Sequence, residues 1–345
     1  YAMQEAIQWI GSSIKKAIEY QKAWLNVKKR LDASKESAEN LRSELLGLSE
    51  RISASFKELA KIAETAGQLG IAADNIAKFT EEIAWFSQIT GRSADEAATS
   101  FGKLIKATGW TAENIDELVA NATALGSNFA ANEQEILKFA ERIAGTGSIA
   151  NIATKDLLAA GAAFSQVGIA SQRGGTAVSR VLQKMSADIQ EWGSDLETMA
   201  DLVGKSTDEI QKQFEESWGS AQLLSDIIHA LGEEGITAKQ TFEELYGSNI
   251  RTTKSFLTLS EDADEFDRAL ERVEDTRENL INQKSRLDDI YSSESARLKQ
   301  LNDEYDNLIA KLSEIGKSYA VDVGEGLMWV KTSWEEVEAA QENTL

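Results

Sequence analysis

Residues 145–185 read GTGSIANIATKDLLAAGAAFSQVGIASQRGGTAVSRVLQKM. A helix of very small residues lies between two glycine-rich segments, and a second, apolar-periodic helix follows at Thr176–Met185. Glycine favours turns, whereas small side chains let helix backbones approach one another closely. The stretch therefore predicts tightly packed helices separated by glycine turns.

The same pattern of short helices separated by glycines extends over residues 70–260, where we expect a compact helical core domain with no β-sheet. Ser93-Ala-Asp-Glu96 has the spacing of a capping box and predicts a helix start. The expected turns lie near Gly91, Gly109, Gly126, Gly145–Gly147, Gly168 and Gly174–Gly175.

An internal repeat lies within this domain. The segment 76–84 matches the segment 136–144 at six of nine positions, and Phe101 and Phe164 follow at corresponding places. We interpret the repeat as a duplicated helix–turn–helix unit, about 70–127 and 128–185. The alternative is a chance match between two amphipathic helices of similar composition.

Before the core domain, residues 1–69 carry a heptad pattern, which predicts one long coiled-coil helix. Their net charge is +2. The pattern consists of apolar and small residues at alternating steps of three and four: Trp24, Val27, Leu31, Ser34, Ala38, Leu41, Leu45, Leu48, Ile52, Ser55, Leu59, Ile62, Ala66 and Leu69.

After the core domain, heptads return from Phe266 to Ile315 and predict a second coiled-coil helix at 261–315, with net charge −8. Glycines then interrupt the helical pattern in an amphipathic tail, 316–345. Two arrangements stay open: the coils pair antiparallel within one chain, or each associates with other copies.

Composition limits the possible partners. The 345 residues carry a net charge of −21, which argues against general binding to nucleic acid or anionic membranes. Cysteine and proline are absent. No run of about 18 apolar residues is present, so we expect no membrane span. The chain starts without Met and ends within a helical pattern, so we expect it to be part of a longer protein.

The sequence contains no motif that indicates catalysis. Gly145-Thr-Gly-Ser-Ile-Ala150 matches a loose dinucleotide fingerprint but lacks the strand that must precede it. The run Asp262–Asp267 lacks the glycine and glutamate of an EF-hand loop. The single histidine, His229, is expected on a helix surface or satisfied in the core. We therefore predict no enzyme activity, no catalytic residue, no cofactor and no metal.

The ordered motifs from Phe56 to Asp262 resemble the core region of phage tail tape measure proteins, a family of long-tailed phages and prophages. The resemblance is carried by Leu59-Ala-Lys-Ile-Ala, Gly67-Gln-Leu-Gly-Ile71, Ile76-Ala-Lys-Phe-Thr, Ser93-Ala-Asp-Glu-Ala-Ala98, Ala144-Gly-Thr-Gly-Ser-Ile-Ala-Asn-Ile, Leu157-Leu-Ala-Ala-Gly-Ala-Ala-Phe-Ser-Gln-Val-Gly-Ile169, Gly174-Gly-Thr-Ala-Val-Ser-Arg-Val-Leu-Gln183, Leu245-Tyr-Gly-Ser-Asn and Ser255-Phe-Leu-Thr-Leu259.

The resemblance implies a structural protein that sets tail tube length during assembly and occupies the tube lumen of the virion before DNA ejection. It implies homo-oligomers formed through the coils, contacts with the tail tube protein and tail assembly chaperones, no specific nucleic-acid binding, and host cytoplasm as the place of assembly. Family members are usually longer and often carry hydrophobic or wall-degrading segments, which this sequence lacks. Two other readings are a coiled-coil scaffold or adaptor, and an effector carried by a tail-like secretion machine.

Overall fold

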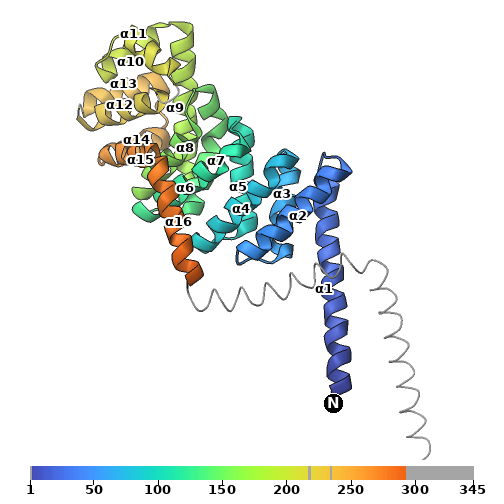
Figure 1. Cartoon of the computed structure of the whole chain (residues 1–345). Coiled ribbons are helices and arrows are strands. Elements are labelled where there is room, and N and C mark those ends of the chain that lie inside the picture. Colours follow the sequence, from blue (N-terminus) through green and yellow to red (C-terminus); the bar gives the residue numbers. More distant parts are fainter. Residues whose placement is uncertain (1, 217–218, 234, 293–345) are drawn as a thin grey trace, which may run out of the picture. The chain divides into compact units, whose positions relative to one another are not determined.

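The computed structural model describes residues 2–216, 219–233 and 235–292 (Figure 1). Over these ranges the regular elements are helices and no strand occurs, so the all-α prediction is confirmed. Contacts divide the chain into two units, and the described residues fall mainly into a first unit up to residue 84 and a second, 85–290. The domain boundaries expected at 69/70 and 260/261 stay predictions.

The N-terminal unit is built from three helices and the start of a fourth. Both α1 and α2 pack on α3. The ring of Tyr20 meets Phe56 edge-on, with centroids 6.0 Å apart, and Trp24, Leu45 and Leu59 are buried. The helices are α1 (Ala2–Arg30), α2 (Lys35–Arg51), α3 (Phe56–Leu69) and α4 (Ala73–Thr90).

Two serines explain why the expected single helix over residues 1–69 is wrong. Ser34 and Ser55 have extended backbones and act as N-caps of α2 and α3. The Ser34 hydroxyl accepts from the Ser37 amide at 3.1 Å, and Ser55 forms a reciprocal capping box with Glu58. The two serines of the heptad series are therefore helix starts, and the apolar members fill a core among three helices.

The second expected coil also differs. Within its described part it consists of α15 (Asp264–Glu274) and α16 (Thr276–Ser292), with a break at Asp275. α15 packs on α8 and α6 of the core. Asn279 of α16 donates to the Asn121 side chain of α6 at 2.8 Å. The described part therefore belongs to the helical core, whereas the rest of 261–315 and the tail 316–345 lie outside the described residues.

The core unit is centred on α7, which packs against α5, α8 and α9 (Figure 1). None of the helices within the described ranges combines the length and low charge that crossing a bilayer requires. The remaining elements are α5 (Ala94–Thr108), the short 3₁₀ turn η1 (Ala112–Asn114), α6 (Ile115–Asn128), α7 (Glu133–Ile149), α8 (Thr154–Gln166), α9 (Ser171–Glu191), α10 (Ser194–Val203), α11 (Thr207–Glu215), α12 (Gly219–Glu233), α13 (Ile236–Tyr246) and α14 (Ile250–Ser260).

A chain of aromatic rings joins four helices of this core. Phe139 of α7 stacks at a tilt on Phe164 of α8, with centroids 5.2 Å apart. Phe164 meets Phe256 of α14 edge-on at 5.6 Å, and Phe256 contacts Phe242 of α13 at 5.1 Å. All four rings are fully buried, so they anchor the packing of helices that are distant in sequence.

The glycines fall into two groups, and one group was predicted wrongly. Gly91, Gly109 and Gly168 lie in turns with positive φ, as expected. The other expected turns lie inside helices: Gly126 in α6, Gly145–Gly147 in α7, and Gly174–Gly175 in α9. Several of these provide space for a neighbour, since a Cβ on Gly174 would lie 2.6 Å from the Phe139 ring.

Tight packing of the small-residue helix is confirmed. Residues 156–164 of α8 are all buried. A Cβ on Gly161 would lie 2.7 Å from the carbonyl oxygen of Ile136 in α7, a contact with backbone that cannot move aside. The glycine therefore sets how closely α7 and α8 approach.

The two repeat copies lie on α4 and α7, and the following phenylalanines lie on α5 and α8. Their ring contacts differ. Phe101 packs edge-on against Phe86, whereas Phe164 packs against Phe139, the counterpart of Phe79. The duplication stays a prediction.

Candidate functional site

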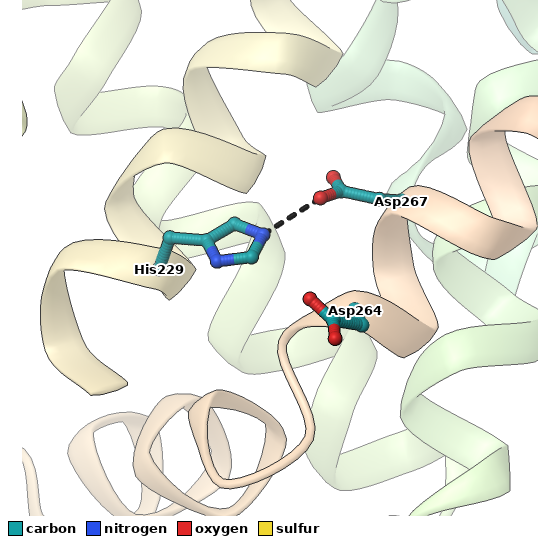
Figure 2. A group of neighbouring side chains, drawn as sticks. All are labelled: His229, Asp264 and Asp267. Atoms are coloured by element: carbon teal, nitrogen blue, oxygen red, sulfur yellow. Dashed lines mark hydrogen bonds and ion pairs between the residues drawn. The ribbon is translucent and has the colours of Figure 1, made fainter. Parts of the chain in front are cut away.

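The single histidine lies where two helices of the core unit meet. Figure 2 shows His229 on α12 facing Asp267 on α15, with Asp264 one turn earlier. The His229 Nε2 and Asp267 Oδ2 atoms are 2.7 Å apart, and the Ser225 hydroxyl donates to the other carboxylate oxygen. The histidine is therefore hydrogen-bonded and about one-third exposed, in agreement with the expected satisfied histidine.

The chemistry open to this cluster is limited. Candidate ligand atoms of His229, Asp264 and Asp267 lie within 4.8 Å of one another. Ligands about 2.1 Å from a tetrahedral metal lie roughly 3.4 Å apart, so a metal would have to replace the 2.7 Å hydrogen bond between His229 and Asp267 and move these two atoms farther apart. Ser225 donates to the carboxylate and not to the imidazole, which is not the order that activates a nucleophile. The cluster is best described as a set of hydrogen bonds that joins α12 and α15.

A second feature shares Asp267 with that cluster. A pocket of about 510 Å³ opens where α8, α12 and α15 meet, and we call it the acidic pocket. Three of its carboxylates lie on one face of α15, because positions four and seven residues apart share a face. It is lined by Asp156, Ala221, Gln222, Asp267, Leu270, Glu271 and Glu274.

Asp156 is the unusual member of the acidic pocket. It is 2 % exposed, and its Oδ2 atom has no hydrogen-bond partner among the described residues. Burial raises its pKa to about 7; the Lys155 ammonium group opposes this shift and the Glu274 carboxylate adds to it. Lys155 itself pairs with Glu274 at 2.7 Å. A buried carboxylate oxygen without a hydrogen-bond partner is costly, and an incoming cation would relieve that cost.

A third feature has the opposite charge. A depression of about 600 Å³ lies between α9 and α14, and we call it the basic groove. Arg173 and Arg180 of α9 and Arg251 and Lys254 of α14 line it, and no carboxylate does. All four side chains are exposed, and none has an ion-pair partner in the part of the chain that the structure describes. In a chain of net charge −21, such a group of unpaired cations is unusual.

The dinucleotide-like segment is no loop. Gly145 and Gly147 lie in the last turns of α7, which ends at Ile149. A Cβ on Gly147 would lie 2.5 Å from the Leu157 side chain, so this glycine provides space for helix packing. The segment has no phosphate-binding geometry, because that geometry needs a turn between a strand and a helix.

Sequence reasoning found His229 and the run Asp262–Asp267 separately but did not join them. Asp267 is 38 positions from His229, and no local spacing links the two. The acidic face of α15 could have been found from the spacing of its carboxylates. Asp156 carried no signal, since it lies in a small-residue helix beside a lysine.

Comparison with known proteins supplies the family. The family model for phage-related minor tail proteins matches residues 42–322. The chain belongs to this family. A phage-related minor tail protein is a structural component of the virion, so this chain is a phage tail protein. Neither the curated proteins nor the solved structures include a significant match to it.

Proposed function

We propose that this minor tail protein is a tape measure, a non-enzymatic protein that sets the length of the tail tube during assembly and occupies its lumen before DNA ejection. The observation that carries the proposal is the family match over residues 42–322. The ordered sequence blocks between Phe56 and Asp262 support the finer assignment, because they resemble the tape measure core.

The physics of helices supports a ruler. Each residue of an α-helix adds about 1.5 Å along the axis, so chain length encodes distance. The described residues are mostly helical and carry no helix-breaking proline. In this proposal copies associate along the tail axis and the tube protein polymerises around them. Tail assembly chaperones assist this assembly in the host cytoplasm.

The acidic charge fits a protein that shares a tube with DNA. A net charge of −21 repels phosphates and limits adhesion to the DNA that later passes through the same space. We expect the chain to show no tight binding to duplex DNA at physiological salt in a gel-shift titration. Tight binding there would contradict this part of the proposal.

Tail length is the decisive measurement. Three extra copies of residues 276–289, inserted after Ser292 in the full-length phage protein, add 42 residues, or about 63 Å of helix. We expect electron micrographs of the mutant phage to show tails lengthened by about that distance.

An unrelated helical insert of the same length is the matched control, because a ruler responds to length and not to sequence. It should lengthen the tail equally. Tails of unchanged length on assembled particles from both mutants would exclude a ruler and leave the scaffold reading.

A further inference from the structure

The acidic pocket and the basic groove are complementary, and both lie within the core unit. They share no residue, and no ion pair among the described residues joins them. The groove supplies long cationic side chains that are exposed and unpaired, and the pocket supplies carboxylates around a shallow hollow. Complementary charge of this kind brings surfaces together and fixes their orientation.

Asp156 shows that the acidic pocket is more than a solvated acidic surface. Asp156 is 2 % exposed and its Oδ2 atom has no hydrogen-bond partner among the described residues, although the residue lines an open hollow. Carboxylates of a solvated helix face make their hydrogen bonds to water, whereas a buried one needs a donor. The hollow is too large for one bare ion and has room for the end of an arginine or lysine side chain.

The spacing of the charges also matches. Arg173 and Arg180 are seven residues apart on α9, and Asp267 and Glu274 are seven residues apart on α15. Seven residues of helix span about 10.5 Å in either case. Asp267 already bonds His229 and Glu274 already pairs with Lys155, but both carboxylates stay partly exposed and can accept from a second cation. Two arginine–carboxylate contacts can therefore form together when α9 of one molecule lies alongside α15 of another.

We propose that basic side chains of the groove in one copy of this chain enter the acidic pocket of a second copy. Each copy then offers one groove and one pocket. When both contacts form between the same two copies, the result is a two-fold dimer; when each copy uses its groove and its pocket with different copies, the contact repeats into rings or filaments. The contact rests on the two surfaces alone and stands independently of the tape measure assignment.

The absence of cysteine permits a direct test on the full chain. Thr176→Cys places a thiol in the groove, and Gln222→Cys places one in the pocket. When the two variants are mixed and treated with a short bismaleimide linker, we expect a crosslinked dimer on a denaturing gel. Lys106→Cys, at an exposed position outside the groove, replaces Thr176→Cys as the matched control and should give no such product with Gln222→Cys.

Charge reversal separates this contact from association through other parts of the chain. Arg173→Glu with Arg251→Glu in the groove copy should lower the crosslink yield at least about tenfold. Glu271→Arg with Glu274→Arg in the pocket copy alone should do the same. When both reversals are present in the mixture, the charges are complementary again and the yield should recover, which also shows that both variants are folded.

Three outcomes overturn the proposal: no crosslink between the unreversed copies, a yield that ignores the reversals, or no recovery in the doubly reversed mixture. A gel shift with a short DNA duplex tests whether the groove binds the phosphates of nucleic acid instead of the acidic pocket. Binding that the groove reversal abolishes would assign the groove to phosphates and would also overturn the proposal. The tail-length experiment does not depend on any of these results.

Discussion

The N-terminal helices and the central core differ in how sequence relates to helix continuity. In residues 1–69 the apolar pattern is continuous, yet the helix is interrupted before Ser34 and Ser55, where new helices begin. In the core, glycines interrupt the pattern, yet α7 runs through Gly145 and Gly147 without a break. A serine hydroxyl can satisfy a helix start, and a helical glycine can accept a close neighbour. Periodicity and composition report neither role directly.

The largest expected effect is at Gly161 in the core. Gly161→Leu places side-chain atoms where the Ile136 carbonyl lies 2.7 Å from an ideal Cβ. Because backbone cannot move aside cheaply, we expect a loss of more than about 4 kcal/mol in the free energy of unfolding, measured by urea titration with circular dichroism. An unchanged midpoint would mean that α8 is not packed on α7.

The next effect concerns the carboxyl group of the same buried helix. The pKa of Asp156 is raised from 3.8 to about 7, so the folded state holds the proton more tightly than the unfolded chain. Stability therefore falls as pH rises from about 4 to about 7, and the full cost is present above that range. We expect Asp156→Asn to stabilise the protein by about 3 to 4 kcal/mol at pH 8 and hardly at all at pH 4.

Urea titrations at the two pH values measure this difference. Glu271→Gln, at an exposed carboxylate of the same pocket, is the control and should change stability by less than about 0.5 kcal/mol at either pH. An equal effect of Asp156→Asn at pH 4 and pH 8 would show that burial does not disfavour the charged carboxylate.

A smaller effect distinguishes three N-terminal helices from one. If Ser55 caps α3, Ser55→Ala removes the capping box with Glu58 and destabilises the protein by about 1 kcal/mol. If Ser55 lay inside a continuous coiled coil, alanine would stabilise it, because alanine is the better helix former. Thermal melts give the sign, and Ser43→Ala inside α2 is the control for a true helix interior.

The smallest effect tests the continuity of α7. Gly145 is helical and has open space around its Cβ position. Gly145→Ala should stabilise the protein by about 0.5 to 1 kcal/mol, measured by urea titration. Gly168→Ala is the matched contrast and should destabilise it, because Gly168 has φ +75°. A loss at Gly145 as well would place a turn there.

The sequence by itself determined what depends on near neighbours along the chain. The all-α class, the small-residue helix α8 and the turns at Gly91 and Gly168 were predicted in this way, and the acidic face of α15 was within reach of the same rules. These features follow from local rules of helix periodicity, turn geometry and side-chain size.

Tertiary structure alone decided the rest. Ser55 is a helix cap and not a seam position of a coiled coil, and Gly147 leaves space for Leu157 and does not turn the chain. Both outcomes depend on which helix packs opposite. The pairing of His229 with Asp267, the burial of Asp156 and the meeting of α9 with α14 in the basic groove join residues tens of positions apart. No local spacing specifies such contacts, because they form only when apolar faces of separate helices are buried together.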